Sequence, residues 1–273
     1  MKKIYVSADI EGIWGNSNPV YTMRGGAEYE EYRKNMIHEV NLVIDLLFKN
    51  GADEVVVNDS HGNMDNLLPS EMDPRASFII SNGAYKEYGM MEGLDETFSG
   101  VCLIGYHGKA NSEGVMSHTN WGAMIHDIRI DGVSMGESGI NACLAREFGV
   151  PVILIAGDSA LKKQVKSEFL EDAYFVQTKQ AINNQCALCC SKNELVGRYD
   201  SMIQKAMHSV FENVHNDLQP NMEITFHHKR NADFVSRMSD VTYVGDCKVS
   251  IEKPTFKELY QTMRFVIMNC NNF

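Results

Sequence analysis

Two carboxylates stand close together near the start of the chain, in the stretch VSADIEGIWG of residues 6–15. Asp9 and Glu11 lie two residues apart at the end of an apolar run. Because side chains alternate along a strand, positions i and i+2 share a face, so we expect both carboxylates to point the same way. Two like charges side by side are costly unless a cation lies between them. The pair therefore indicates either a solvated strand end or a cation site.

Two further apolar runs end in groups that bind divalent metals. The run at 55–57 leads to Asp59 and His61, and the run at 101–104 leads to His107. In an open parallel sheet, ligands bind in the crevice at the carboxyl ends of the strands, so we expect these side chains to converge. A cation among them would turn the repulsion between the first two carboxylates into coordination. Oxygen and imidazole ligands together favour zinc, with manganese or cobalt as alternatives.

The elements that would position these residues alternate between strands and helices. Apolar residues recur at helical spacing between the first two strands, and Gly51 suits the position after a helix C-terminus. Such a β–α–β order favours a parallel sheet covered on both faces, so we predict an α/β fold with a mostly parallel sheet and helices on both faces. The predicted strands are 4–8, 55–57, 101–104 and 152–156, and the predicted helices are 28–50, 136–148 and 160–171.

The pattern changes after about residue 180. Helical patterns at 191–215 and 254–270 flank the alternating segments EITFHH and DVTYVGDCKVSIE, which read as strands of an antiparallel or mixed portion. We therefore predict a metal-binding α/β catalytic domain over residues 1–180. A smaller C-terminal α+β domain would follow over residues 181–273, with an approximate boundary.

Composition restricts the classes of partner and the compartment. With 25 basic and 36 acidic residues the net charge is −11, so we expect no nucleic acid binding. No apolar run approaches the length of a membrane span, and Asp9 interrupts the N-terminal run before a signal-peptide core could form. Seven cysteines, an odd number, fit reduced thiols. We expect a cytoplasmic protein without a membrane partner. The lone C-x-x-C of CALCC lacks the second pair that a structural zinc site needs.

Five blocks in sequence order resemble a known family. They are SADIEGIWG, VNDSHGNMDNL, MMEGLDETFSGVCLIGYHGKANSEGVMSHT, GESGINACLAREFGVPVILIAGD and TKQAI. They are similar to the DppA-type D-aminopeptidases, the M55 family of zinc peptidases, from residue 4 to about 182. A weaker similarity continues in ADFVSRM and FKELYQTMRFVIM. The segment 183–235 diverges, which leaves substrate specificity open.

The resemblance implies a complete set of site residues. It implies two zinc ions per subunit and a catalytic histidine, with the metal ligands Asp9, Glu11, His61, His107 and Glu137 and the catalytic residue His118. Residue types and strand ends alone indicate the first four ligands. Glu137 and His118 depend on the resemblance, because a glutamate that begins a helix is also favoured by the helix dipole.

The expected function is that of a zinc-dependent aminopeptidase acting on short peptides. The resemblance implies peptides with D-amino acids and a homo-oligomer, possibly ring-shaped. Two metals would activate a water molecule, and His118 would protonate the leaving amine. One alternative is a binuclear metallophosphoesterase, although that class typically carries D-x-H and G-N-H where this chain has DIE and NDSH. The other is a non-catalytic metal-binding protein that retains the fold.

Several polar residues near these motifs have two interpretations. Asp59 could orient a ligand imidazole or cap its loop. Asp158 could line the crevice or cap a helix. Lys179, in TKQAI, could contact a substrate carboxylate or a developing oxyanion, or simply be solvated. His227 and His228 are neighbours on an alternating segment and face opposite sides, which favours a surface role.

Overall fold

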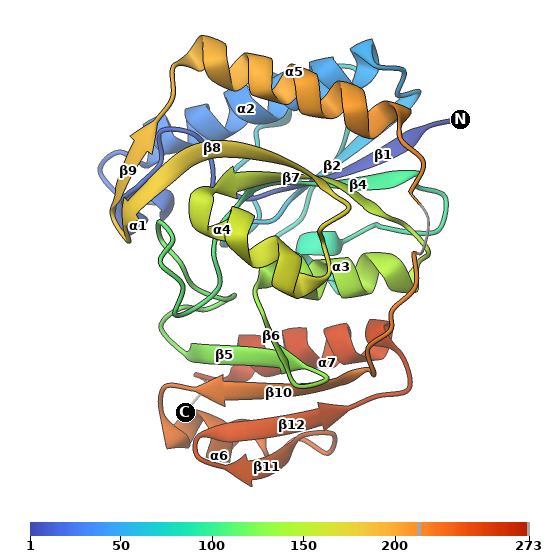
Figure 1. Cartoon of the computed structure of the whole chain (residues 1–273). Helices are drawn as coiled ribbons and strands as arrows, with labels where there is room; N and C mark the ends of the chain where they lie inside the picture. Colours follow the sequence, from blue (N-terminus) through green and yellow to red (C-terminus); the bar gives the residue numbers. More distant parts are fainter. Residues whose placement is uncertain (212–213, 272–273) are drawn as a thin grey trace.

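The computed structural model describes residues 1–211 and 214–271, and Figure 1 shows two sheets, one above the other. The larger sheet has the strand order β3-β2-β1-β4-β7-β8-β9, and only the pairing of β8 with β9 is antiparallel. Its strands are β1 (Lys3–Ala8), β2 (Glu54–Asp59), β3 (Ser77–Ile79), β4 (Gly100–Tyr106), β7 (Val152–Asp158), β8 (Tyr174–Asn183) and β9 (Cys186–Cys189). The predicted mostly parallel α/β sheet is confirmed.

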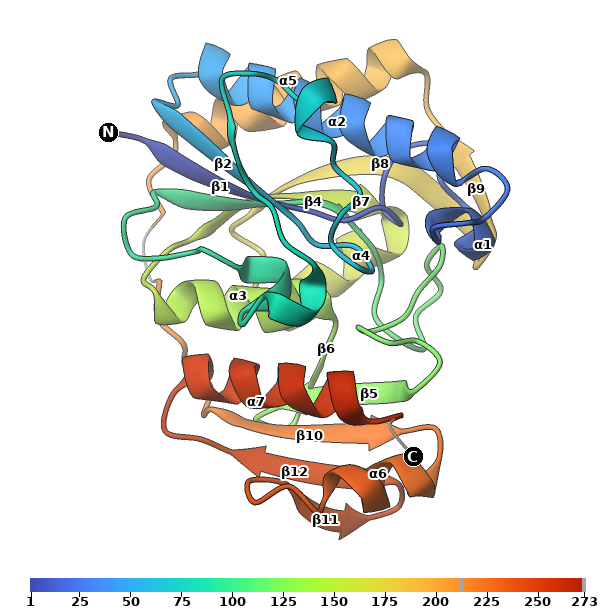
Figure 2. The same ribbon diagram turned by 180° about the vertical axis from the view of Figure 1, so that it is seen from behind.

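Helices cover both faces of this sheet. Figures 1 and 2 show α2 (Tyr29–Lys49) and α5 (Lys192–His208) on one face, with α3 (Glu137–Glu147) and α4 (Ser159–Gln164) on the other. α2 follows the predicted helical pattern because Met36, Val40 and Leu47 form one buried stripe against the sheet. The predicted helix at 160–171 is shorter, since α4 passes into a 3₁₀ turn at Val165–Glu168. The remaining short helices are α1 (Pro19–Thr22), η1 (Pro69–Glu71), η2 (Gly83–Tyr85) and η3 (Gly89–Met91).

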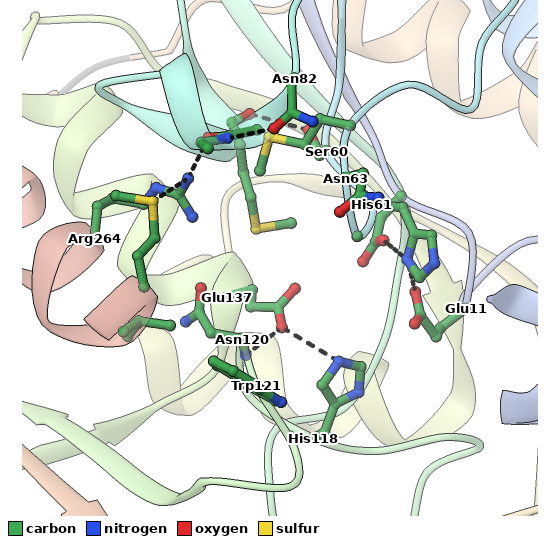
Figure 3. Close-up of a pocket in the computed structure, with 18 residues that line it drawn as sticks. Glu11, Ser60, His61, Asn63, Asn82, His118, Asn120, Trp121, Glu137 and Arg264 are labelled. Carbon is green, nitrogen blue, oxygen red and sulfur yellow. Dashed lines mark hydrogen bonds and ion pairs between the residues drawn. The ribbon is translucent and has the colours of Figure 1, made fainter. Parts of the chain in front are cut away.

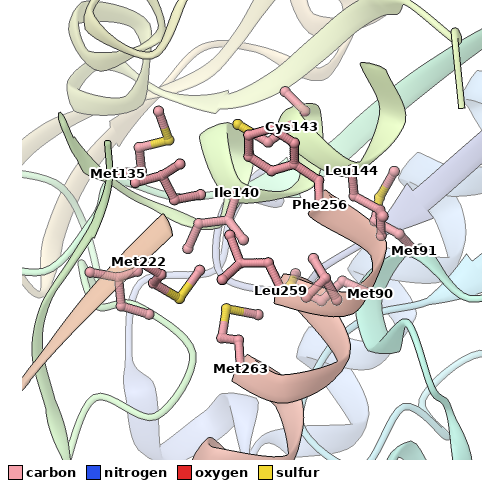
Figure 4. Close-up of a cluster of buried hydrophobic side chains, with 14 of the residues drawn as sticks. Met90, Met91, Met135, Ile140, Cys143, Leu144, Met222, Phe256, Leu259 and Met263 are labelled. Carbon is pink, nitrogen blue, oxygen red and sulfur yellow. The ribbon is translucent and has the colours of Figure 1, made fainter. Parts of the chain in front are cut away.

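The smaller sheet is antiparallel and has the order β11-β12-β10-β5-β6. Its elements are β5 (Ile125–Ile130), β6 (Val133–Met135), β10 (Asn221–Phe226), α6 (Lys229–Val235), β11 (Thr242–Gly245), β12 (Lys248–Glu252) and α7 (Phe256–Asn269). α7 lies between this sheet and α3 (Figure 2). Leu259 and Met263 of α7 pack with Ile140 of α3 and Met222 of β10 in one buried apolar cluster (Figure 4). This smaller α+β portion agrees with the predicted fold class.

The chain passes between the two sheets more than once. β5 and β6 were not predicted, and they join the smaller sheet before the chain returns to the larger one through α3. α5 packs on the larger sheet, although the sequence analysis assigned its residues to the C-terminal portion. The predicted boundary near residue 180 falls inside β8, so the division into two domains stays a prediction. No described helix has the length and apolar character needed to cross a membrane.

A buried carboxyl group joins the two helices on one face of the larger sheet. The Glu39 carboxyl on α2 accepts hydrogen bonds from the backbone N–H of Trp14 at 2.8 Å and from the hydroxyl of Tyr199 on α5 at 2.5 Å. Burial raises the pKa of Glu39 to about 7 from its ordinary 4.5. The ionised group is therefore costly in the folded state near neutral pH.

We expect Glu39→Gln to reduce the pH dependence of stability between about pH 4.5 and 7. In this window the unfolded carboxyl has lost its proton while the folded one retains it, so the free energy of unfolding falls as pH rises, by roughly 3 kcal/mol in total. Urea unfolding at pH 5 and 7.5 measures this change. The exposed Glu171→Gln is the control, and an equal slope in all three proteins would contradict the assignment to Glu39.

Candidate metal centre

The carboxyl ends of three neighbouring strands bring the first candidate ligands together. Ala8 is paired with Asp59 of β2 and with Ile104 of β4, so these three strands end close together. Asp9, His61 and His107 therefore follow the strands at the same edge of the sheet. The register of the parallel strands thus produces the convergence that the strand ends predict.

Asp9 and Glu11 lie in the turn after β1, because the strand ends at Ala8. Strand alternation is therefore the wrong reason for their common direction. The turn lies against the end of β4, where the N–H of Gly12 donates to the carbonyl of Gly105 at 2.6 Å. A Cβ at Gly12 would stand 1.9 Å from the carbonyl oxygen of Tyr106, so this close approach requires glycine.

Asp9, Glu11 and His61 form the first group of candidate ligands. Nδ1 of His61 lies 3.2 Å from Oδ1 of Asp9 and 3.0 Å from Oε2 of Glu11 (Figure 3 shows His61 and Glu11). Nε2 of His61 lies 2.9 Å from the carbonyl oxygen of Thr22, which can only accept, so Nε2 carries the proton. In the neutral imidazole the lone pair of Nδ1 then faces the two carboxylates, as a metal ligand would.

His107, His118 and Glu137 form the second group. Nε2 of His107 lies 3.4 Å from Oε2 of Glu137, and Nε2 of His118 lies 3.9 Å from Oε1 of Glu137. Each imidazole faces a backbone carbonyl through Nδ1, that of Gly108 for His107 and that of Met116 for His118. Nδ1 therefore donates, and both Nε2 atoms are left for other partners. The two rings stack with centroids 4.2 Å apart.

Three buried atoms of these groups make no hydrogen bond with any described residue. They are Oδ2 of Asp9, Oε2 of Glu11 and Nε2 of His107. Oδ2 of Asp9 lies 3.5 Å from Nε2 of His107, so Asp9 faces both groups, one with each oxygen. Within each group the ligand atoms lie within 4.8 Å of one another. Buried polar atoms without partners are costly, and these are carboxylate and imidazole atoms of the kind that bind zinc.

The charges of the two groups shift the pKa values of their members. Burial alone would lower the pKa of His107, but the carboxylates around it, Glu137 first, raise it to about 10. Burial and the neighbouring Glu11 carboxylate raise the pKa of Asp9 well above its ordinary value. Burial and His107 lower the pKa of His118, which favours its neutral form. These shifts favour protons on Asp9 and His107, and a divalent cation bound among the carboxylates would take the place of those protons.

A cavity of about 560 Å³ opens beside both groups. Figure 3 shows Glu11 and His61 on one side of the cavity and Arg264 on the opposite side, with Glu137 and His118 between them. The apolar side chains of Met90, Ile267 and Met268 form part of the cavity wall. Arg264 lies on α7, the last described helix of the chain. Arg264 could not be found from the sequence, because no pattern in the sequence relates α7 to the strand ends.

A family model described as D-aminopeptidase, Peptidase_M55, matches residues 1–265. The chain belongs to this family. It is 38% identical over 192 residues to the D-aminopeptidase of Bacillus subtilis (strain 168), which covers 69% of this chain and 68% of that relative. A solved structure, the Zn-dependent D-aminopeptidase DppA from Bacillus subtilis, described as a self-compartmentalizing protease, superposes with a TM-score of 0.93 and 30% identity, covering 99% of this chain and 98% of that one. The predicted family is confirmed, and the chain is a metal-dependent aminopeptidase, a hydrolase.

Two aspartates of this family member stabilise loops of the site. Asp59 accepts hydrogen bonds from the backbone N–H groups of Asn66 at 2.5 Å and Leu67 at 2.7 Å, so it caps its loop and does not orient the imidazole of His61. Asp158 caps the N-terminus of α4 and also accepts from the N–H of Val115 at 2.6 Å, in the loop that carries His118.

Lys179 supports the turn that carries Asp9 and Glu11. Its side chain is buried, and its ammonium donates to the carbonyl oxygens of Glu11 at 2.5 Å and Ile13 at 2.8 Å and to that of Asn16. Burial lowers the pKa of Lys179 to about 8. Neither of the two roles considered for this lysine holds, because its side chain is buried and not solvated, and all three donors are directed at the backbone and not at a substrate.

The remaining histidines and cysteines lie elsewhere. His227 and His228 are exposed, in agreement with a surface role, and the ring of His227 packs edge-on against His126. Neither ligand group of the described residues includes a cysteine, and Cys186 of the CALCC segment is exposed.

A chain of buried polar groups runs beneath the site. The hydroxyl of Tyr260 on α7 donates to the side chain of Asn141 at 2.6 Å, and Asn141 donates to the hydroxyl of Tyr106 at 2.8 Å. The hydroxyl of Ser7 lies 2.6 Å from those of Tyr106 and Ser60. These hydrogen bonds connect α7 and α3 with the ends of three strands that are followed by candidate metal ligands.

Proposed function

We propose that this family member is a zinc aminopeptidase that removes N-terminal residues from short peptides, including peptides of D-amino acids. The observation that carries the proposal is the pair of ligand groups with three buried atoms that make no hydrogen bond. The zinc dependence of the related Bacillus subtilis enzyme supports zinc as the metal. The preference for D-residues rests on the family description and on the names of the relatives.

Five residues would hold two zinc ions. Asp9, Glu11 and His61 are the ligands proposed for one ion, and His107 and Glu137 those for the other, with Asp9 shared because its two oxygens face different groups. Zinc bound by these residues would supply a water molecule activated for attack and would polarise the scissile carbonyl. The N–H of Asn120 donates to Oε1 of Glu137 at 2.7 Å and fixes the direction of that carboxylate.

His118 is the proposed catalytic residue. The carbonyl of Met116 holds the Nδ1 proton, so Nε2 is the atom that accepts and returns a proton. The side chain lines the cavity and is 26% exposed, which gives Nε2 access to a bound peptide. We assign it the protonation of the leaving amine.

A homo-oligomer would restrict the enzyme to short peptides. The solved relative is described as self-compartmentalizing, and we propose a similar, ring-shaped assembly for this chain. The hairpin of β8 and β9 exposes Ile182 and Leu188, with 62% and 61% of their surface accessible. Apolar side chains exposed together on an edge hairpin are suited to contact with another copy.

Metal analysis combined with a panel of D- and L-dipeptides tests this function. We expect two zinc ions per chain, release of free amino acid from D-Ala-D-Ala, loss of activity after chelation and recovery after zinc is restored. Turnover of phosphate esters without peptide cleavage would instead support a metallophosphoesterase. Bound zinc without hydrolysis of any dipeptide would support a non-catalytic protein. Preferential cleavage of L-dipeptides would refute the D-specificity alone.

A further inference from the structure

One arginine faces the metal ligands across the cavity. Among the described residues that line this cavity, Arg264 is the sole arginine or lysine, whereas Asp9, Glu11 and Glu137 are acidic. Figure 3 shows its guanidinium group on the side opposite His61 and Glu11. The cavity thus has an anionic, metal-binding side and a cationic side.

The guanidinium of Arg264 is held in place but only partly paired. Nη2 donates to the carbonyl of Gly83 at 2.7 Å, and Nε is buried without a hydrogen bond. Gly89, at φ +46°, makes room for it, since a Cβ there would lie 2.6 Å from Nε and 2.9 Å from Cζ. Among the described residues no carboxylate lies within 4.0 Å of this guanidinium, so its charge lacks a counter-ion in the fold.

A carboxylate is the group that such an arginine binds best. The planar guanidinium presents donors in a fork that matches two carboxylate oxygens, and the charge makes the hydrogen bonds strong. With a net charge of −11, the protein offers an anionic ligand few other favourable positions. A short peptide carries an ammonium group at one end and a carboxylate at the other, which matches the two sides of the cavity.

We propose that Arg264 binds the C-terminal carboxylate of a short peptide whose N-terminal end lies at the metal ligands. Arg264 is then a specificity-determining residue that makes a free carboxylate part of the substrate. The apolar side chains of Met90, Ile267 and Met268 line the cavity along with it and offer apolar contact to the side chain next to that carboxylate. This inference rests on the proposed aminopeptidase function.

Two substrates that differ in one group test the inference. Hydrolysis of D-Ala-D-Ala and of its C-terminal amide is measured for the wild type, Arg264→Met and Arg264→Lys. We expect the wild type to prefer the free acid, and Arg264→Met to lower kcat/KM for the acid roughly 30-fold or more, mostly through KM, with little change for the amide. Arg264→Lys should recover part of the preference, because it restores charge without the fork.

Control measurements distinguish binding of the substrate carboxylate by Arg264 from a purely structural role of this residue. Arg237→Met makes the same change at an exposed position outside the cavity and should leave both substrates unaffected. Zinc content and the circular dichroism spectrum should stay the same in every variant. An equal loss for acid and amide in Arg264→Met would overturn the inference and leave Arg264 as a brace for Gly83.

The two proposals fail in different ways. A wild type that cleaves acid and amide equally well would refute the role of Arg264 and leave the aminopeptidase standing. A wild type that cleaves neither would refute the proposed function. Calorimetric titration with D-Ala-D-Ala then tests Arg264 directly, because binding by the wild type and not by Arg264→Met supports the inference, and equal or absent binding in both overturns it.

Discussion

Replacing His118 by alanine is expected to lower kcat by roughly 10²–10⁴-fold while the zinc content stays near that of the wild type. The loss follows from removing the group that transfers a proton to the leaving amine. Burial and His107 lower the pKa of His118, so the neutral imidazole can accept a proton at neutral pH. Steady-state kinetics on a dipeptide and metal analysis by mass spectrometry measure the two quantities.

The zinc content distinguishes a catalytic residue from a ligand at this position. His118 is grouped with His107 and Glu137 as a possible metal ligand, so loss of zinc together with activity would make His118 a ligand. His227→Ala is the matched control, because this histidine is exposed and lies outside both ligand groups. It should leave kcat and zinc content unchanged.

Lys179→Met is expected to destabilise the protein by about 3 kcal/mol or more, because hydrogen bonds to a buried charge are lost and their carbonyl acceptors stay buried. The turn that these carbonyls belong to carries Glu11, so we also expect a roughly 10–100-fold weaker zinc affinity. Urea unfolding of the metal-free protein measures the first effect, and titration with zinc against a competing chelator measures the second.

The control for Lys179 is a lysine that makes no such contacts. Lys162→Met removes an exposed lysine on α4 and should change neither stability nor zinc affinity by a comparable amount. If Lys179→Met unfolds at the same urea concentration as the wild type, the ammonium does not hold the turn. If only stability falls and zinc binds as before, the turn keeps its shape without the lysine.

Strand ends in the sequence were sufficient to group Asp9, Glu11, His61 and His107. This grouping is correct because parallel strands in register end at the same edge of the sheet. The residues that follow them therefore lie close together, whatever the sequence distance between them. Glu137 and His118 could not be grouped with them in this way. Glu137 begins α3 only after the chain has passed through β5 and β6 of the other sheet, so no local pattern ties it to the strand ends.

The missed elements depend on partners that are distant in the chain. β5 pairs with β10, about 95 residues later, and its short alternating run is identified as a strand only by that pairing. The position of Lys179 was missed for a similar reason, since its motif gives no sign that the turn after β1 folds over it. Arg264 reaches the cavity because α7 packs between α3 and the smaller sheet, an arrangement that helical periodicity cannot express.

The buried hydrogen bonds from Tyr260 to Ser60 connect α7, which lines one side of the cavity, with the strand ends next to the candidate ligands. If α7 moved outward to admit a bulkier peptide, Asn141 and Tyr260 would lose each other as buried hydrogen-bond partners, which is costly. We therefore expect α7 to stay in place when a peptide binds, so that the width of the cavity limits the size of the peptide. Accepting larger peptides would require smaller residues in place of Met90 or Met268, and not a movement of α7.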